Sequence, residues 1–465
     1  MRTLRQSLAR LVEILYVFAL YLLFYPLSSS LRHKSFGERL HDALERLGIV
    51  FIKLGQFLAT RSHFDQATQK WLEKLWDGRT PLPFDAIRPA LEAEIALSRF
   101  DSFDERALAA ASIAQVHVAW YDGRKAAVKI VRPGAVEDMM LDITLARLGV
   151  RIGRHIFKFV RYLQQEGAVE TVAEWLMKEV DLINEAAGAE ANHVCYKEVD
   201  CVVVPEIWFK SKTVLVMEFI EGGIPASQWK EEYRVKGYDP QKSIRNWFVY
   251  TFGWTFQFIT VPIHGDPHPA NILILPDGKI GLIDFGVWGK GTEQELRLFV
   301  SAVFAVYAQD AGRVTEILLE LGGGELDDPT LGSFEREVAR YVKKCRTRPF
   351  DWWLTELGDV IVRYQLPMPK VFALICRFGI IGNKIAQDFF PGYSTIDLVG
   401  DEIRTGMYKH LLSEWEHIDP LPLLHALTTR AKQAPMDAAQ FVGHPIETLA
   451  EALATVIEPL REQTA

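Results

Sequence analysis

The sequence has few cysteines and no excess of positive charge. Its four cysteines, among 465 residues, show neither C-x-x-C spacing nor zinc-like pairing with histidines, so we expect reduced thiols and not a disulfide framework. With 52 basic and 60 acidic residues, the net charge of −8 argues against nucleic acid as the main partner. Hydrophobic residues make up 49% and charged residues 24%, which excludes disordered and collagen-like chains and is typical of folded soluble domains.

Internal repeats and long hydrophobic runs are also missing. An uncharged, aromatic-rich stretch covers residues 14–27, but it is shorter than the roughly 20 residues that span a bilayer as a helix. Three interpretations stay open: a membrane-dipping or marginally spanning anchor, a buried core helix, or a cleaved signal peptide. We expect the anchor, and therefore an apolar membrane-associating segment over residues 1–34.

The remaining sequence changes from helical to strand-like patterns and back. Ser35 and Glu38 have the spacing of a capping box and open one helical stripe that continues to Leu58. Strand-like runs on either side of Asp122-Gly123 predict a hairpin. The patterns predict an α+β fold with a helical extension over 35–100, a small β-rich lobe over 101–220, a larger helical lobe over 221–400 and a helical tail over 401–465.

Two features of the β-rich lobe could serve a bound ligand. Small residues at the hairpin entrance (Ala109, Ala110, Ala111 and Ser112) would let the backbone approach a bound group, although tight packing alone also explains such a turn. Lys129 lies inside the apolar strand-like run 126–131. If it points inward it must be paired or ligand-bound, whereas on an edge strand it would point to water.

An acidic run follows in a helical pattern over residues 163–191. Asp181 and Glu185 are four residues apart and would share one helix face, whereas Glu179 would point elsewhere and need another partner. A solvated acidic face is the simpler interpretation of such a run.

The strongest signal is His264-Gly-Asp266-Pro-His268-Pro-Ala-Asn271 followed by Asp284-Phe-Gly. Asn271 lies five residues after Asp266, and Asp284 lies thirteen after Asn271, which matches the D-x-x-x-x-N loop and the D-F-G motif of phosphoryl-transfer enzymes. Asn271 and Asp284 would bind Mg²⁺ through hard oxygen atoms, and Asp266 would orient or deprotonate an acceptor hydroxyl. A metal hydrolase that uses His264, Asp266 and His268 would leave the D-F-G unexplained.

The order of these motifs along the chain is specific for a kinase-like active site that uses ATP and Mg²⁺. Lys129 would neutralise the α- and β-phosphates, and an acid on the following helix would hold it in place. Glu218 stands in the segment 217–220, where the connection between the lobes would pass the adenine. No A-P-E motif follows the D-F-G, so regulation by an activation-loop phosphosite is not supported.

These motifs identify a family resemblance. With the K-x-G-Q motif at Lys53 to Gln56, the alanine-rich loop that ends in Gln-Val-His, the E-x-D pair, H-G-D-P-H-P and D-F-G, residues 35–400 resemble the UbiB (AarF-like, ABC1-like) atypical kinases. The resemblance implies a protein-kinase-like two-lobed fold with an N-terminal K-x-G-Q extension. It also implies an ATPase or unorthodox kinase that works at a membrane, on lipids or proteins that support isoprenoid quinone (ubiquinone) biosynthesis.

The resemblance also implies roles for individual residues. The alanine-rich loop Ala109 to Ser112 replaces a glycine-rich loop, and the extension with Lys53 and Gln56 covers the active site. Glu179 would face that extension together with Asp181, and Glu185 is the expected partner of Lys129. The sequence departs from the family at Ala270, where many members have glycine, and at 61–64. It also shows no paired C-terminal spanning helices, so attachment to the cytoplasmic face of a bacterial inner or organellar membrane would depend on residues 1–34.

Alternatives from other classes remain. A small-molecule phosphotransferase shares H-G-D-x-x-x-x-N but lacks the K-x-G-Q extension, and a non-catalytic nucleotide-sensing scaffold would keep the motifs without turnover. A direct oxidoreductase is disfavoured, because no G-x-G-x-x-G follows a first strand and no metal triad for oxygen chemistry is evident. The phosphoryl acceptor and the oligomeric state are not set by these patterns.

Overall fold

The computed structural model describes residues 4–59, 65–76, 81–110, 113–153, 168–254, 261–322, 326–348, 350–364, 366–367, 370–393 and 395–399. The helical tail expected at 401–465 lies outside these residues. Contacts divide the chain into two compact units. The first contains Met1–Glu190 and Pro205–Phe219, and the second contains Ala191–Val204 and the chain from Ile220 onward.

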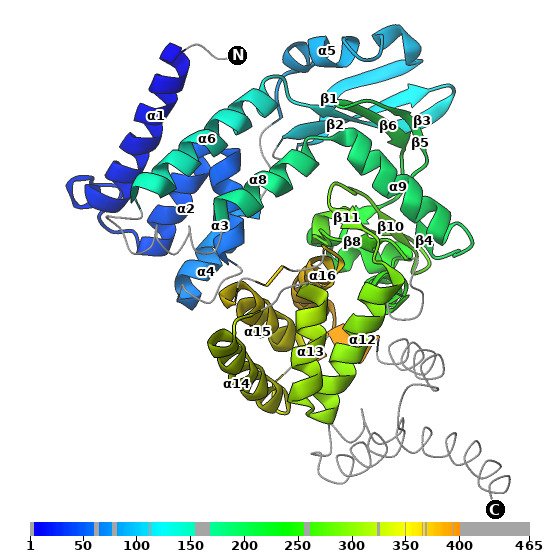
Figure 1. Cartoon of the computed structure of the whole chain (residues 1–465). Coiled ribbons are helices and arrows are strands. Elements are labelled where there is room, and N and C mark those ends of the chain that lie inside the picture. The colour runs from blue at the N-terminus through cyan, green and yellow to red at the C-terminus, as the bar shows by residue number, and fades with distance from the viewer. Residues whose placement is uncertain are drawn as a thin grey trace, which may run out of the picture. The chain divides into compact units, whose positions relative to one another are not determined.

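The first unit joins a group of helices to a β-sheet (Figure 1). Its helical elements are α1 (Leu4–Phe18), η1 (Ala19–Leu23), η2 (Tyr25–Leu27), α2 (Phe36–Leu47), α3 (Ile49–Ala59), α4 (Gln66–Glu73), η3 (Lys74–Trp76), α5 (Phe84–Glu92), η4 (Leu97–Arg99), α6 (Ala135–Gly153), α8 (Ala168–Glu179) and the start of α9 (Leu182–Tyr196). Its strands are β1 (Ser102–Ala110), β2 (Ala114–Tyr121), β3 (Arg124–Val131), β5 (Ile207–Lys210) and β6 (Val214–Glu218).

The five strands form one antiparallel sheet in the order β1-β2-β3-β6-β5. Helix α5 covers one face and α9 the other (Figure 1). Because successive side chains of a strand point to opposite faces, Val128 and Ile130 join the core under α5, whereas Ala127 and Val131 join the core under α9. Both faces are buried, which explains the continuous apolar run of β3.

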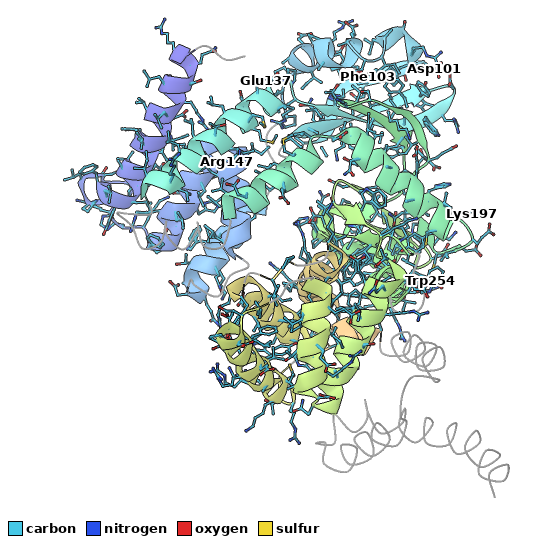
Figure 2. The ribbon with its side chains drawn as sticks, viewed as in Figure 1. Asp101, Phe103, Glu137, Arg147, Lys197 and Trp254 are labelled. Carbon is cyan, nitrogen blue, oxygen red and sulfur yellow. The ribbon has the colours of Figure 1, made fainter. Side chains whose placement is uncertain are left out.

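The hairpin predicted at Asp122-Gly123 is present. Tyr121 pairs with Arg124, and the two turn residues have φ of 48° and 73°. Both angles are positive, as a two-residue type I′ hairpin turn requires. The Asp101 carboxylate accepts a hydrogen bond of 2.8 Å from the Gly123 backbone N–H, and Figure 2 labels Asp101 at this end of the sheet.

The helical extension contains a break that the pattern did not predict. Ser35 caps α2 by accepting a hydrogen bond from the Glu38 backbone N–H, as expected, but the stripe that was predicted to continue to Leu58 is split at Gly48. Gly48 has φ 95°, a left-handed value that favours glycine and ends the helix. The apolar residues of both helices still pack into one core, as predicted. The prediction of a single continuous helix is wrong.

The acidic run is divided in the same way. Glu179 is the last residue of α8, and α9 begins only at Leu182. Asp181 therefore lies just before α9, and its carboxylate accepts a hydrogen bond of 3.1 Å from the Ile183 backbone N–H at the start of that helix. A short acidic side chain competes for backbone donors and so favours a helix start over a helix interior.

The second unit is mostly helical. Its helical elements are the end of α9, η5 (Ala226–Gln228), η6 (Glu231–Lys236), α10 (Pro240–Trp247), η7 (Phe248–Gly253), η8 (Pro269–Asn271), α12 (Glu293–Ala308), α13 (Ala311–Gly322), α14 (Asp328–Cys345), α15 (Phe350–Arg363), α16 (Lys370–Phe389) and α17 (Thr395–Leu398). Its strands are β4 (Val202–Val203), β7 (Ile224–Pro225), β8 (Ile263–His264), β9 (Ile272–Ile274), β10 (Ile280–Leu282) and β11 (Trp288–Gly289). They form a sheet in the order β4-β10-β9-β7 and a separate pair β11-β8.

Candidate active site

Lys129 and Glu185 form a buried ion pair in the first unit. The Lys129 Nζ lies 2.7 Å from both Glu185 carboxylate oxygens, and the side chains are 9% and 3% exposed. Lys129 points to the α9 face of β3 because it alternates with Val128, and Glu185 lies in the first turn of α9, next to the buried Ala186. The structure thus brings together the lysine and the acid that the sequence pointed to, across 56 residues.

The alanine-rich loop follows β1. Ala109 and Ala110 are the last two residues of this strand, opposite Val116 and Gln115, whereas Ala111 and Ser112 lie outside the described residues. A register shift between Ala107 and Ala109 marks an irregularity just before the loop.

The Gln-Val-His that ends the family motif has a clear structural role. The Gln115 side chain binds both backbone groups of Leu82, accepting from its N–H at 3.0 Å and donating to its C=O at 3.3 Å. The Gln115 amide nitrogen is also 2.8 Å from His117 Nε2, and His117 Nδ1 is 2.9 Å from the Asp104 carbonyl. In this arrangement Nδ1 donates and Nε2 accepts, so His117 is neutral, and burial accordingly lowers its pKa.

The K-x-G-Q residues lie on α3. Gln56 donates a hydrogen bond of 3.0 Å to the Leu75 carbonyl. A Cβ at Gly55 would lie 2.3 Å from Leu75 Cδ1 and 2.8 Å from Leu44 Cδ1, so only glycine allows this close packing without movement. Lys53 is partly buried on the same helix. Glu179 ends α8, which shares a core with α3, but its side chain is outside what the structure describes.

Glu218 is the last residue of β6, paired with Ala126 of β3. Its carboxylate accepts a hydrogen bond of 3.3 Å from the Glu206 backbone N–H. The chain leaves the first unit directly afterwards, between Phe219 and Ile220. The segment predicted to connect the lobes is therefore where the chain passes between the two units.

The H-G-D loop in the second unit is stabilised by its own backbone and side chains. His264 is 5% exposed, and its Nδ1 accepts a hydrogen bond of 3.2 Å from the Asp266 backbone N–H. Burial lowers the pKa of His264, although the charges of Asp266 and Asp284 act in the opposite direction. The Asp266 carbonyl accepts from the His268 backbone N–H at 2.7 Å and from the Asn271 amide at 3.3 Å.

Asn271 and Asp284 lie at the same end of the β9–β10 hairpin. Ile272 pairs with Leu282, and the Ile283 backbone N–H donates to the Asn271 carbonyl at 3.1 Å. Asp284 has φ 63°, a left-handed value uncommon for a residue with a side chain. Such a conformation costs on the order of 1–3 kcal/mol and is typical of functional sites.

The donor set at this hairpin end suits Mg²⁺. The Asn271 amide nitrogen donates to the Asp266 carbonyl, so its Oδ1 is the atom that could coordinate a cation. Asp284 supplies a carboxylate at the same end. Amide and carboxylate oxygens are the hard ligands that Mg²⁺ prefers.

Arg377 is a site residue that the motifs did not indicate. It comes from α16, and its Nη2 donates a hydrogen bond of 2.9 Å to Asp266 Oδ1. The two side chains are 20% and 16% exposed and lie 111 residues apart in sequence. No local pattern around Arg377 distinguishes it from a surface arginine of a helix.

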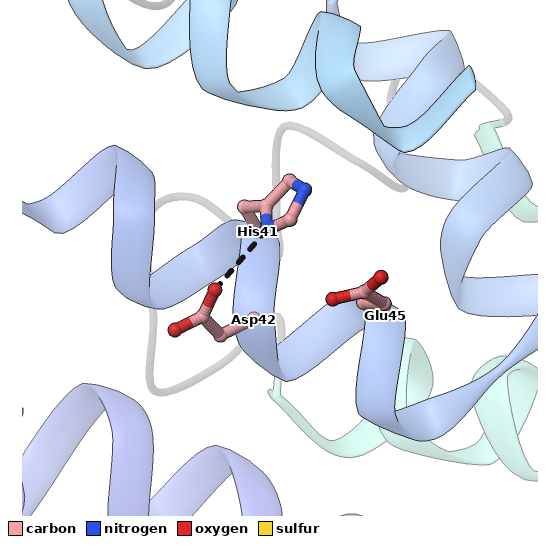
Figure 3. Close-up of side chains that lie close together, drawn as sticks. All are labelled: His41, Asp42 and Glu45. Atoms are coloured by element: carbon pink, nitrogen blue, oxygen red, sulfur yellow. Dashed lines mark hydrogen bonds and ion pairs between the residues drawn. The ribbon is translucent and has the colours of Figure 1, made fainter. Parts of the chain in front are cut away.

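The metal-hydrolase alternative finds no support in these contacts. The Nδ1 atoms of His264 and His268 accept backbone N–H groups within the loop. Among the described residues, the group that places three histidine or carboxylate ligand atoms together is elsewhere, at His41, Asp42 and Glu45 on α2 (Figure 3). There Lys34 lies 2.6 Å from Asp42, so the carboxylate already has a cationic partner.

Comparisons with known proteins identify the family of the chain. Residues 77–318 match the family described as ABC1 atypical kinase-like domain. A protein named probable protein kinase UbiB from Actinobacillus pleuropneumoniae is 32% identical over 88% of this chain and 77% of its own length. Its namesake from Shewanella loihica is 28% identical over 79% of this chain and 69% of its own length.

The chain covers a smaller share of a plant relative. Protein ACTIVITY OF BC1 COMPLEX KINASE 3, chloroplastic, from Arabidopsis thaliana is 30% identical over 76% of this chain but only 50% of its own length.

The family match covers more than half of the chain, and the mixed helical and sheet structure agrees with the kinase-like fold class that the motifs predicted. The chain belongs to the ABC1, or UbiB-type, family of atypical kinase-like proteins.

Proposed function

We propose that this protein is an ATP- and Mg²⁺-dependent kinase or ATPase of the UbiB type that works at a membrane in support of isoprenoid quinone biosynthesis. The observation that carries the proposal is the buried Lys129–Glu185 pair. Burying a lysine and its acidic partner costs desolvation free energy. In phosphoryl-transfer enzymes such a lysine binds the phosphates of ATP, and the acid holds it in position. The quinone pathway comes from the name UbiB carried by relatives.

Each remaining residue has a role that follows from its chemistry. Asn271 and Asp284 would hold Mg²⁺, which neutralises charge on the phosphates when bound. Asp266 would orient the acceptor hydroxyl or water and take its proton. Lys129 would bind the phosphates while Glu185 keeps its ammonium in place.

The surrounding residues would shape the nucleotide site. The loop Ala109 to Ser112 would approach the phosphates and Glu218 the adenine. The extension with Lys53 and Gln56, together with Glu179 and Asp181 that would face it, would regulate access.

A thermal-shift experiment tests the proposal. MgATP should raise the melting temperature of the wild-type protein, because a ligand that binds the native state stabilises it by mass action. The rise should depend on Mg²⁺ and disappear in Asp284→Asn. No rise at saturating MgATP would refute nucleotide binding, and an equal rise in Asp284→Asn would refute the metal assignment.

The Arg377–Asp266 ion pair favours a second candidate, a nucleotide-sensing scaffold. In the structure, an oxygen of the proposed catalytic carboxylate already accepts from a guanidinium. If the protein is a scaffold, it would bind MgATP, and Asp266→Asn would complement a deletion strain as well as the wild type does. A kinase or ATPase would lose complementation with Asp266→Asn.

A further inference from the structure

One side of α1 is apolar and exposed along the helix. The exposed fractions lie between 56% and 60% for four large side chains at helical spacing: Leu8, Val12, Leu15 and Tyr16. The exposed apolar surface continues past the helix with Leu23, Phe24 and Leu27. Soluble proteins rarely expose so many large apolar side chains in one place, and such a patch marks contact with a partner or a membrane.

The opposite side of α1 is fixed to the helical part of the first unit, where Figure 1 shows α1 at the edge. Ile14 and Val17 are buried in its core. Arg10 binds the buried Asp142 of α6 through two hydrogen bonds of 2.8 Å, and its guanidinium also donates to the Leu47 carbonyl. One side of α1 therefore packs against the protein, and the other side is apolar and exposed.

A second arginine fixes the segment that follows. Arg39 of α2 is 8% exposed and donates to the carbonyls of Tyr21, at 3.1 Å, and Lys34. Its guanidinium carbon also lies 3.6 Å from the centre of the Tyr25 ring. Together Arg10 and Arg39 hold both halves of the apolar segment against the unit.

By length and composition, the helix Arg5–Leu23 could cross a membrane. Crossing would place Arg10 in hydrocarbon and break the contacts of both arginines with the protein, leaving Asp142 without its partner. Lying along a membrane surface keeps every one of these contacts and covers the exposed apolar side. The geometry therefore favours a flat orientation over a spanning one.

Charge identifies the kind of surface. Residues 1–34 contain five basic residues and one acidic residue, whereas the whole chain carries −8. An amphipathic helix with basic flanks binds bilayers that contain anionic lipids.

We propose that α1, η1 and η2 form a flat contact with an anionic lipid bilayer through Leu8, Val12, Leu15, Tyr16 and the apolar residues that follow, without crossing it. This inference deepens the membrane part of the proposed function and rests on it. It assigns the lipid-facing side, the protein-facing side and the two arginines that set the orientation.

Vesicle flotation with the full chain tests the lipid-facing side. Vesicles of phosphatidylcholine with about one third phosphatidylglycerol should carry the wild type, and pure phosphatidylcholine should carry less. Val12→Glu should reduce the bound fraction roughly tenfold, since a charge replaces an exposed apolar side chain that the bilayer would cover. Val194→Glu is the matched control, because Val194 is also an exposed helical valine, at 68%. Leu8→Glu repeats the test at a second position.

Protease digestion of an N-terminal tag on vesicle-bound protein tests the orientation. A flat helix leaves the tag outside and fully digested, whereas a spanning helix protects it inside the vesicle. Protection of the tag, or full binding by Val12→Glu and Leu8→Glu, would overturn the inference. So would a wild-type dimer that these variants dissociate and that shows no affinity for vesicles.

The MgATP thermal shift, measured without vesicles, separates this inference from the nucleotide function. Val12→Glu should keep the shift, which also shows that the variant is folded. Vesicle binding without a thermal shift would support the membrane contact and refute the nucleotide site. A thermal shift without vesicle binding would support the nucleotide site and refute the membrane contact.

Discussion

Removing the carboxylate of Glu185 should destabilise the first unit strongly. In Glu185→Leu, the Lys129 ammonium loses both contacts of 2.7 Å while remaining in a site where it is 9% exposed. Breaking one partner of a buried pair costs about 3–5 kcal/mol, because the other charge stays buried without that partner. For a unit of this size, about 2–4 °C per kcal/mol converts this loss into a fall in melting temperature of about 6–20 °C.

The double variant Lys129→Met/Glu185→Leu separates the loss of the Glu185 charge from lost packing. If the buried ammonium causes the loss of stability, removing it as well should restore most of the melting temperature, since apolar replacements of a buried pair are often neutral or stabilising. The double variant should nevertheless fail to bind MgATP productively.

An exposed ion pair whose acid lies on the same helix provides the control. Lys210 Nζ lies 2.6 and 2.8 Å from the Glu190 carboxylate, but these side chains are 42% and 47% exposed. Glu190→Leu should cost about 0–1 kcal/mol, since solvent screens such pairs. Calorimetry on the four proteins measures the melting temperatures. A small effect of Glu185→Leu, equal to that of Glu190→Leu, would refute the reasoning, as would a double variant as unstable as the single one.

Three further predictions follow from other contacts. Arg377→Met should lower turnover while leaving MgATP affinity and the melting temperature unchanged, and Arg377→Lys should recover part of the rate. Unchanged turnover in both variants would show that the contact with Asp266 has no catalytic role. Burial lowers the pKa of His117 from 6.5, so below pH 6.5 the folded state binds fewer protons than the unfolded state. The free energy of unfolding should therefore decrease as the pH falls below 6.5, by up to about 1.4 kcal/mol per pH unit. Denaturant unfolding between pH 5 and 8 should show a flatter profile in His117→Leu, and an unchanged slope would contradict this origin. Gly55→Ala should cost about 1–3 kcal/mol by overpacking, measured as a lower melting temperature with an intact MgATP shift.

The sequence supplied those parts of the site whose residues belong to local motifs. Asp122-Gly123 predicted its hairpin because only a few residue types adopt two positive φ angles in succession. Lys129 was recognisable because a lysine inside an apolar strand needs a partner. The helix breaks were missed because apolar spacing continues across Gly48 and the acidic spacing continues across Asp181, although the backbone does not. Arg377 was missed because its partner is 111 residues away.

The Lys129–Glu185 pair of the first unit and the Arg377–Asp266 pair of the second unit differ in burial, and burial determines what each contributes. Lys129 and Glu185 are at most 9% exposed, so removing one charge while the other stays buried is costly. Arg377 and Asp266 are 20% and 16% exposed, so water can solvate either one when the other is removed or turns toward a ligand. The first pair is therefore suited to fix the ammonium that we propose binds the phosphates. The second is suited to a contact that forms and breaks, as the proposed exchange of the guanidinium for an acceptor hydroxyl at Asp266 requires.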